Sequence, residues 1–354
     1  MKKNFLITTG GSGGHVVPAT ILYEHLSNEM NVVISTDKRG LRYLDQAIYQ
    51  FEIINTPKLN NILFLPFGLF KILFLTIKTI IFLKKEKIEK VFSTGGYMSL
   101  PVILAAKFLK LHIYLLEPNQ IIGRANKFFL NFCEKIFCYT NRVKNFPEIF
   151  KDKIVVINPL VRKNIYNLKQ HTKNTNKFTL LIVGGSQGAN IFDKNLKKAV
   201  INISKKIPLR VIQQTSEKNV SSLIDHYSKN NVENNIFSFD KNFSTNISKA
   251  DICITRAGAS TLSELSVLNI PFIAVPLPTS KDNHQYENAN YYKNNDCCWI
   301  IEQNFFDEKI EEFLLKILKN KSDFLKKKAN LKKLNYQNSW INVNQKILKI
   351  INEN

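Results

Sequence analysis

Cysteine is scarce in this chain, and its five cysteines form no metal-binding or disulfide pattern. Their number is odd and no C-x-x-C pair occurs, so neither a zinc site nor a disulfide framework is expected. An apolar leader with a small-residue cleavage site is also lacking, because Met1-Lys2-Lys3 runs directly into a strand-like segment. We therefore expect a protein that stays in the reducing cytoplasm.

Acidic residues are few, with 28 Asp and Glu against 50 Lys and Arg, which gives a formal net charge of +22. Such a surplus would attract nucleic acid or an anionic membrane. The lysines are spread along the whole chain, and no zinc-finger, RRM-type or basic-region pattern occurs. We expect no nucleic acid partner, and we assign the charge partly to compositional bias and partly to an anionic phospholipid surface.

Two similar glycine-rich loops are the most informative feature that is present. The sequence GGSGGH at residues 10–15 follows the apolar run at 5–9, and GGSQGA at 184–189 follows the apolar run at 180–183. Each reads as a strand that passes through glycines into a helix, which presents backbone N–H groups and the positive end of a helix dipole to an anion. The chain therefore looks internally duplicated.

Apolar runs alternate with helical patterns in both halves, as in a parallel sheet covered by helices on both faces. The expected strands are residues 5–9, 31–35, 90–94, 113–116, 179–183, 209–213, 236–238, 251–255 and 272–275. We predict an α/β fold of two Rossmann-like, doubly wound parallel-sheet domains that face each other across a cleft. The predicted domains are residues 1–157 and 158–339, with a helix at about 340–354 packing back on the first.

Neither glycine loop matches a common nucleotide signature. Val16 occupies the third glycine position of the dinucleotide pattern, although Asp37 stands where a nicotinamide-binding fold keeps its ribose-binding acid. No Walker lysine follows either loop, which argues against a P-loop ATPase. An NAD-type oxidoreductase remains a remote alternative.

The apolar segment at residues 62–83 is long enough to suggest a membrane span, but Pro66, Lys71 and Lys78 interrupt it. The lysines recur every seven residues and so lie near one face of a helix, as in a helix that rests at a lipid interface. The predicted membrane contacts are Phe67, Phe70, Lys71, Phe74 and Lys78. The alternative is a core helix of the first domain with its lysine edge in water.

Seven motifs, in order and spacing, resemble the lipid II-forming branch of glycosyltransferase family 28. They are GGSGGHVVP at 10–18, TGGYMSLP at 94–101, EPNQIIGRAN at 117–126, NPLVR at 158–162, GGSQGA at 184–189, RAGASTLSE at 256–264 and DNHQYENA at 282–289. The resemblance implies a GT-B enzyme that moves GlcNAc from UDP-GlcNAc to the MurNAc C4 hydroxyl of undecaprenyl-pyrophosphoryl-MurNAc-pentapeptide (lipid I), with inversion.

The resemblance also implies a peripheral place on the cytoplasmic face of the bacterial inner membrane and contacts with other cell-wall synthesis proteins. The chain departs from the family pattern at Leu116 and Pro118, which replace a histidine and a glutamine beside Glu117. Smaller departures are Ser12 and His284. A related GT-B transferase acting on diacylglycerol or another polyprenyl acceptor, and a non-catalytic lipid-binding scaffold, stay as alternatives.

The reaction needs a base for the attacking hydroxyl and a means of neutralising the departing diphosphate. His15 is our candidate base, because the positive end of a helix dipole disfavours its imidazolium form. The alternatives are that His15 only hydrogen-bonds the loop or orients the acceptor diphosphate, and Glu117 is a second candidate base. No DxD-type acidic pair stands near the donor loops. We therefore expect no metal site and no tightly bound cofactor, and Mg²⁺ stimulation stays open.

For the donor, Arg162 and the second loop can bind the diphosphate. The resemblance assigns Glu264 to the ribose hydroxyls, whereas the residues alone equally fit a T-x-x-E capping box at 261–264. The predicted donor residues are Ser12, Gly13, Gly14, Asn119, Arg162, Gly185, Ser186, Gln187, Gly258, Ala259, Ser260, Thr261, Glu264, His284 and Gln285. The predicted acceptor and diphosphate residues are Gly13, Gly14, Gly95, Gly96, Tyr97, Arg124 and Asn126.

Overall fold

The computed structural model describes residues 2–57, 65–168, 177–185, 190–238 and 243–353. The chain divides into two compact units. Unit 1 comprises Met1–Val161 together with Ser339–Asn354, and unit 2 comprises Arg162–Asn338. Unit 1 is therefore discontinuous in sequence, with the whole of unit 2 inserted before its last helix.

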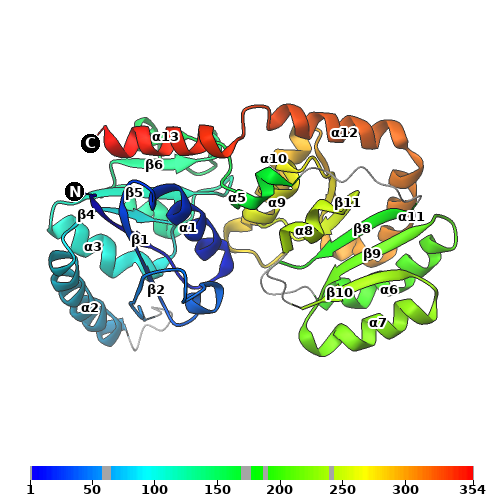
Figure 1. Ribbon diagram of the computed structural model, residues 1–354, viewed down its shortest axis with the longest axis horizontal. Helices are drawn as coiled ribbons and strands as arrows, with labels where there is room; N and C mark the ends of the chain where they lie inside the picture. The colour runs from blue at the N-terminus through cyan, green and yellow to red at the C-terminus, as the bar shows by residue number, and fades with distance from the viewer. Residues whose placement is uncertain (1, 58–64, 169–176, 186–189, 239–242, 354) are drawn as a thin grey trace. The chain divides into compact units, whose positions relative to one another are not determined.

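Unit 1 is built on a seven-stranded parallel sheet with the order β3-β2-β1-β4-β5-β6-β7 (Figure 1). The strands are β1 (Asn4–Thr8), β2 (Asn31–Thr36), β3 (Phe51–Ile53), β4 (Ile88–Ser93), β5 (His112–Glu117), β6 (Lys135–Cys138) and β7 (Ile154–Val156). The α-helices are α1 (Gly13–Leu26), α2 (Leu65–Lys85), α3 (Leu100–Phe108), α4 (Arg124–Phe129) and α13 (Trp340–Asn352). Short 3₁₀ turns lie at Gly40–Tyr43, Tyr97–Ser99 and Glu148–Lys153.

Successive residues of the unit 1 strands point to opposite faces and enter two different cores. Phe5 and Ile7 of β1 pack with α1 and α13, whereas Leu6 packs with α2 and α3 on the other face. Both faces are covered by helices, so the strands read as continuous apolar runs rather than alternating ones. Figure 1 shows α2 and α3 side by side.

Helix α13 contributes to the core of unit 1. Val343, Ile347 and Ile351 are buried in the cluster that contains α1. The Nζ atom of Lys90, on β4, donates a hydrogen bond to the carbonyl oxygen of Ile351 in the last turn of α13. This places a positive charge at the negative end of the helix dipole.

Unit 2 has a six-stranded parallel sheet with the order β10-β9-β8-β11-β12-β13. The strands are β8 (Phe178–Val183), β9 (Leu209–Gln214), β10 (Glu233–Phe237), β11 (Ile252–Thr255), β12 (Phe272–Ala274) and β13 (Cys298–Ile300). The α-helices are α5 (Lys163–Asn167), α6 (Asn190–Ser204), α7 (Val220–Lys229), α8 (Phe243–Ser248), α9 (Ala259–Val267), α10 (His284–Asn294), α11 (Phe306–Lys319) and α12 (Lys321–Leu334). Short 3₁₀ turns lie at Glu217–Asn219, Lys281–Asn283 and Gln303–Phe305.

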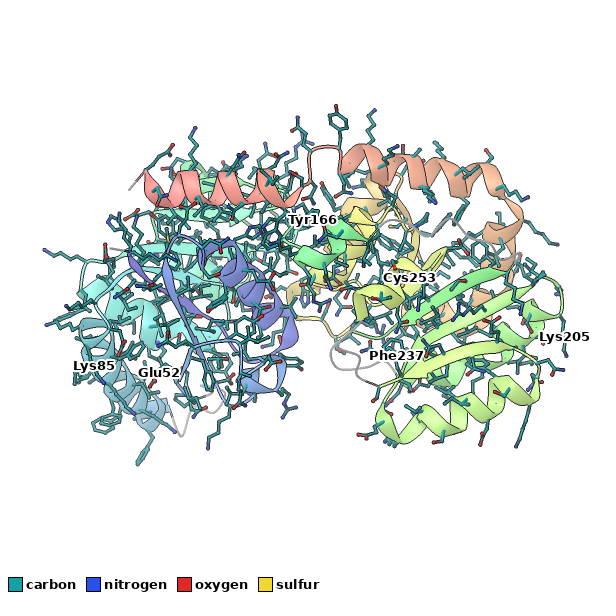
Figure 2. The ribbon with its side chains drawn as sticks, in the orientation of Figure 1. Glu52, Lys85, Tyr166, Lys205, Phe237 and Cys253 are labelled. Atoms are coloured by element: carbon teal, nitrogen blue, oxygen red, sulfur yellow. The ribbon has the colours of Figure 1, made fainter. Side chains whose placement is uncertain are left out.

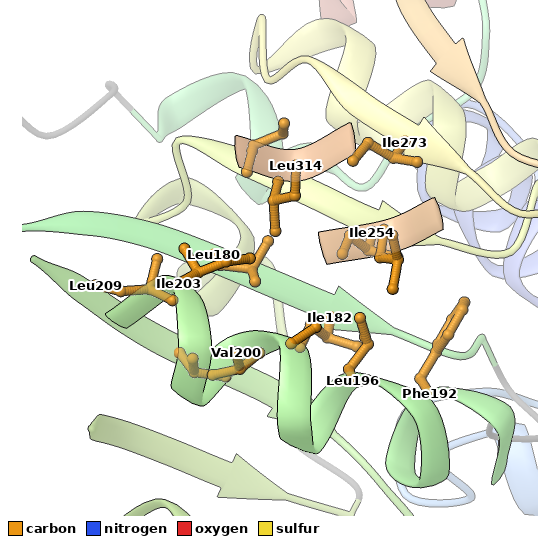
Figure 3. Close-up of a cluster of buried hydrophobic side chains, with 14 of the residues drawn as sticks. Leu180, Ile182, Phe192, Leu196, Val200, Ile203, Leu209, Ile254, Ile273 and Leu314 are labelled. Carbon is orange, nitrogen blue, oxygen red and sulfur yellow. The ribbon is translucent and has the colours of Figure 1, made fainter. Parts of the chain in front are cut away.

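One core of unit 2 lies between its sheet and the helices α6, α7 and α11. Figure 3 shows side chains of the sheet together with those of α6 and α11. Leu180 and Ile182 of β8 and Ile254 of β11 meet Leu196 of α6 and Leu314 of α11 there. Cys253, labelled in Figure 2, lies between Ile252 and Ile254 of β11, and its own side chain is buried. The sheet of unit 2 is thus buried deeply, as the uninterrupted run Leu180–Val183 predicts.

The two sheets have the same topology at their centres. In unit 1, β1 lies between β2 and β4, and in unit 2, β8 lies between β9 and β11. This confirms the predicted fold class of two doubly wound parallel-sheet domains. Four strands escaped prediction: β3, β6, β7 and β13. They have only three or four residues each, which is too short for a periodic pattern to show.

Candidate active site

The strand order of unit 1 reverses between β1 and β4, and ligands of open α/β sheets bind at the carboxyl ends of the strands at such a reversal. The first glycine-rich loop follows β1 and leads into α1. The Gly95-Gly96 pair follows β4. The two loops that the motifs singled out therefore flank the same reversal point.

His15, in the first turn of α1, lies against the Gly95-Gly96 pair. A Cβ atom added at Gly96 would be 3.4 Å from Nε2 of His15, and one added at Gly95 would be 3.4 Å from its Cε1. Both glycines have positive φ, +92° and +83°, which other residues rarely adopt. The pair therefore supplies a backbone conformation and the room that the imidazole occupies.

The hydrogen bond of His15 defines its tautomer. Nδ1 lies 2.9 Å from the carbonyl oxygen of Thr94. A carbonyl can only accept, so Nδ1 carries the proton and donates it, and the neutral ring keeps its lone pair on Nε2. His15 is therefore arranged to accept a proton at Nε2.

Glu117, at the end of β5, is 2% exposed and holds the loop that follows it. Oε1 accepts hydrogen bonds from the backbone N and from Nδ2 of Asn119, at 3.2 and 2.9 Å. Oε2 accepts from the backbone N of Gly123 at 2.8 Å and from Nδ2 of Asn126 at 3.0 Å. A carboxylate engaged by four donors fits a positioning role better than that of a general base, so the geometry favours His15.

Asn126 links this loop to the Gly95-Gly96 pair. Its Nδ2 also donates to the carbonyl oxygen of Leu116, at 2.9 Å. A Cβ atom at Gly95 would lie 3.4 Å from the side-chain amide of Asn126 and equally close to His15. Glu117, Asn126 and His15 thus belong to one cluster, although Leu116 and Pro118 differ from the family pattern.

Asp37 and Arg39 form an ion pair that the sequence did not predict, and we call this pair the brace. Oδ1 of Asp37 accepts from the backbone N of Gly11 at 2.8 Å and of Gly40 at 2.9 Å, and Oδ2 accepts from Nε of Arg39 at 2.8 Å. Burial raises the pKa of Asp37, but these hydrogen bonds outweigh it, and the pKa is lowered overall. The carboxylate that suggested a nicotinamide ribose is therefore occupied in holding the glycine loop.

The matching reversal point of unit 2 lies between β8 and β11. Gly185 follows β8 with φ +77°. After β11, Gly258 precedes α9, so the first N–H groups of that helix belong to Ala259, Ser260 and Thr261. The capping-box alternative at 261–264 is wrong, because Thr261 is the third residue of the helix and not its cap.

Glu264 of α9 is a buried carboxylate beside one arginine. It is 3% exposed, and its Oε1 lies 2.9 Å from Nη1 of Arg162. Burial raises the pKa of Glu264 above its ordinary value, and the charge of Arg162 offsets only part of that effect. The Arg162 guanidinium also lies 5.9 Å from the ring centroid of Phe243. This pair offers hydrogen-bond acceptors and a cation to a polar ligand.

The start of α10 is tied to the start of α9. Oε1 of Gln285 accepts from the backbone N of Leu277 at 2.9 Å, and Nδ1 of His284 donates to the carbonyl oxygen of Lys281 at 2.8 Å. Nδ2 of Asn288 donates to the carbonyl oxygen of Ala257, just before α9, at 3.1 Å. The geometry therefore gathers the predicted Gln285 and Glu264 segments within unit 2.

The predicted residues divide between the units. Unit 1 supplies Ser12, Gly13, Gly14, His15, Gly95, Gly96, Tyr97, Glu117, Asn119, Arg124 and Asn126. Unit 2 supplies Arg162, Gly185, Gly258, Ala259, Ser260, Thr261, Glu264, His284 and Gln285. Ser186 and Gln187 lie outside the described residues. Within the described ranges, no group of three or more His, Cys, Asp or Glu side chains is arranged to hold a metal ion.

Helix α2 leaves most of its apolar side chains exposed. Its buried residues are Ile72, Thr76, Thr79 and Leu83. Among the described helices, the segment Pro66–Lys85 is the one long and apolar enough to cross a membrane by length and composition, and only 28% of its most apolar window is buried. The alternative of a core helix holds for one face of α2, where Leu83 joins a core of unit 1, whereas Phe67 is 80% exposed and Phe70 is 71% exposed. Lys85 marks the end of α2 in Figure 2.

Two family models match this chain. The glycosyltransferase family 28 N-terminal domain matches residues 5–138, and the family 28 C-terminal domain matches residues 179–340. The chain belongs to glycosyltransferase family 28. This family 28 chain is therefore a glycosyltransferase and not a dehydrogenase.

Relatives of this family 28 chain carry one name. The "UDP-N-acetylglucosamine--N-acetylmuramyl-(pentapeptide) pyrophosphoryl-undecaprenol N-acetylglucosamine transferase" of Pelagibacter ubique is 47% identical over 356 residues, covering 100% of both chains. The enzyme of that name from Rickettsia canadensis is 36% identical and covers 90% of this chain and 91% of its own. The crystal structure of MurG from Acinetobacter baumannii covers 100% of both chains with a TM-score of 0.78 at 22% identity, which supports the fold.

Proposed function

We propose that this chain transfers GlcNAc from UDP-GlcNAc to the MurNAc C4 hydroxyl of undecaprenyl-pyrophosphoryl-MurNAc-pentapeptide, which completes lipid II for peptidoglycan. The full-length identity of 47% to the Pelagibacter ubique transferase carries this proposal. The tautomer of His15 and the buried Glu264–Arg162 pair support it, since they supply the proton acceptor and the polar groups that the reaction needs.

His15 acts as the general base. Its Nε2 removes the proton of the C4 hydroxyl while that oxygen forms a bond to the anomeric carbon of GlcNAc. The bond from the anomeric carbon to the β-phosphate oxygen breaks on the opposite face, so the configuration inverts and UDP leaves with its electron pair. Glu117 keeps the neighbouring loop in place and takes no proton.

The donor binds to unit 2. Arg162 and the N–H groups at the start of α9 stabilise the charge that develops on the departing UDP. Glu264 accepts hydrogen bonds from the ribose hydroxyls, and Gln285 with His284 contacts the GlcNAc hydroxyls. Gly185, Ser186 and Gln187 donate to the diphosphate. In unit 1, the residues predicted to contact the donor are Ser12, Gly13, Gly14 and Asn119.

The acceptor binds to unit 1. Its pyrophosphate lies at Gly13 and Gly14, where the start of α1 presents N–H groups. Gly95, Gly96 and Tyr97 form the opposite side of that site. Arg124, which is exposed at the start of α4, and Asn126 line its remaining edge. The proposal includes no tightly bound cofactor, and it leaves stimulation by free Mg²⁺ open.

Transfer of labelled GlcNAc from UDP-GlcNAc tests the reaction, with lipid I and diacylglycerol offered side by side in detergent. Label in a lipid II product is expected. Label in diacylglycerol alone would overturn the acceptor assignment and leave the donor site standing. Failure to bind UDP-GlcNAc would overturn the whole proposal.

Helix α2 rests on anionic phospholipid at the cytoplasmic face of the inner membrane. Phe67, Phe70 and Phe74 are 80%, 71% and 61% exposed, and Lys71 and Lys78 stand exposed among them. Insertion of such a ring removes apolar area from water and gains about 1.5–3 kcal/mol, while the lysines meet the lipid headgroups.

A double variant, Phe70→Ser with Phe74→Ser, tests this docking by sedimentation with vesicles that contain phosphatidylglycerol. We expect binding to fall at least about tenfold, with unchanged turnover of a water-soluble acceptor. Phe305→Ser is the matched control, because Phe305 is 46% exposed and belongs to unit 2 and not to α2. Equal binding of the double variant and the wild type would refute the docking.

A further inference from the structure

The proposed reaction assigns no task to Arg39, yet this side chain is held in a fixed orientation. Its Nε donates to Oδ2 of Asp37 at 2.8 Å, and its Nη2 donates to the hydroxyl of Tyr97 at 2.6 Å. Nη2 also lies 3.1 Å from Sδ of Met98. A guanidinium fixed from two sides has already lost the rotamer freedom that a surface arginine loses when it binds a ligand.

The brace places this charge between the two loops that flank the reversal point of unit 1. A Cβ atom added at Gly11 would lie 3.9 Å from Nη2 of Arg39, so the guanidinium adjoins the first glycine-rich loop. Tyr97 follows Gly95-Gly96 directly, so the same guanidinium nitrogen reaches the second loop. Arg39 therefore connects the two segments that contact His15 and its surroundings.

The two charges of the brace face different environments. The Asp37 side chain is 6% exposed, and its oxygens receive two backbone N–H groups besides the guanidinium. The Arg39 side chain is 40% exposed. The carboxylate is thus buried behind the loop, whereas the arginine side chain stays partly exposed. A planar guanidinium matches the oxygens of a phosphate, and Nη1 of Arg39 takes no part in the hydrogen bonds to Asp37, Tyr97 and Met98.

We propose that Arg39 binds the pyrophosphate of the lipid-linked acceptor and that Asp37 and Tyr97 are the positioning residues that orient it. This inference rests on the proposed function. The ligand is the acceptor diphosphate, which the proposed function places at the start of α1 and at Gly95-Gly96, because Arg39 adjoins both of these segments. Phospholipid phosphate is the other source of the same chemistry, and the experiment separates the two.

Arg39→Gln is compared with Arg42→Gln, which removes the same charge from an exposed residue three positions further on. We expect Arg39→Gln to raise the KM for lipid I about 10- to 100-fold, the loss typical of a hydrogen bond to a charged group, with the KM for UDP-GlcNAc within twofold. Arg42→Gln is expected to change neither. Arg39→Lys should recover part of the loss, since lysine keeps the positive charge but lacks the planar guanidinium with its several N–H donors.

A second acceptor, in which a neutral linker replaces the pyrophosphate, separates ligand binding from loop support. If Arg39 binds the diphosphate, Arg39→Gln and wild type use this acceptor equally well. Equal losses on both acceptors, or a raised KM for UDP-GlcNAc, would show that Arg39 only supports the loops. A loss confined to sedimentation with phosphatidylglycerol vesicles would assign Arg39 to phospholipid instead.

The wild-type enzyme serves as the reference for both proposals. If it fails to transfer GlcNAc to lipid I, the proposed function fails. If it transfers GlcNAc and Arg39→Gln does so with the wild-type KM for lipid I, only the role of Arg39 fails. Tyr97→Phe removes the hydroxyl that accepts a hydrogen bond from Nη2 of Arg39. We expect this variant to raise the KM for lipid I less than Arg39→Gln does.

Discussion

Units 1 and 2 share one strand order but place different chemistry at the point where it reverses. Unit 1 holds His15 with a defined tautomer, and its buried acids Asp37 and Glu117 are engaged by N–H donors of nearby loops. Unit 2 holds the buried acid Glu264 against a single arginine. The comparison teaches that two sheets with the same strand order can present different side chains at their reversal points, because those side chains come from the loops and helix starts and not from the sheet.

Removal of His15 gives the largest effect expected. His15→Ala should lower kcat about 10²- to 10⁴-fold, the range for loss of a general base, with small changes in both KM values. Steady-state kinetics with lipid I and UDP-GlcNAc measure it. His112→Ala is the control, because the His112 side chain is 41% exposed and pairs with Glu134. Near wild-type turnover of His15→Ala would remove the histidine from the base role.

Glu264→Gln should act on the donor alone. We expect the KM for UDP-GlcNAc to rise about 10- to 100-fold, because a charged acceptor of hydrogen bonds is lost. Glu233→Gln is the control, since Glu233 is 46% exposed and makes only surface pairs with Lys177 and Arg210. An unchanged KM for UDP-GlcNAc in Glu264→Gln would contradict the assignment of Glu264 to the ribose.

The same variant should alter the pH dependence of stability. The raised pKa of Glu264 means that the folded protein binds this proton more tightly than the unfolded chain does. The free energy of unfolding therefore decreases as pH rises from the ordinary carboxyl value of 4.5 through the raised value. In Glu264→Gln, stability should no longer fall over this pH range. The Tm of the variant at neutral pH should be no lower than that of the wild type, and thermal unfolding at several pH values measures both.

Glu117→Gln should give the smallest kinetic effect, and it tests whether the buried acids of unit 1 are positioning groups. An amide NH₂ would face N–H donors such as that of Gly123, which costs about 1–3 kcal/mol of stability. We expect a lower Tm and a fall in kcat of about tenfold or less, because only loop geometry suffers. Glu148→Gln, at a side chain 79% exposed, is the control. A loss of kcat as large as that of His15→Ala, at unchanged Tm, would make Glu117 the base.

The sequence predicted the fold well where strands are long and buried. The run Leu180–Val183 is apolar throughout and is followed by glycines, so both its strand and the loop after it could be read directly. The strand Lys135–Cys138 could not be predicted from the sequence, because it has only four residues and starts with a lysine. Such a short strand depends on the neighbours that pair with it, here β5 and β7, and a pattern within its own four residues does not reveal them.

The site was predicted less completely. His15 and Glu264 could be singled out because each lies within a motif, and the motif marks its helix start. The hydrogen bond between Arg39 and Tyr97 could not be predicted, because these residues are 58 positions apart and come together only in the folded chain. The four hydrogen bonds of Glu117 likewise depend on how residues 118–126 turn, which no spacing reveals.

Helix α13 has a consequence for synthesis on the ribosome. The sheet of unit 1 is made first, but Val343, Ile347 and Ile351, which complete one of its cores, are translated only after all of unit 2. Until then the nascent chain exposes part of an apolar surface that later becomes buried. An mRNA truncated before the codon for Trp340 would therefore yield a chain that contains unit 2 but lacks α13. Part of the apolar core of unit 1 would then be exposed, and chaperones and proteases would act on such a chain.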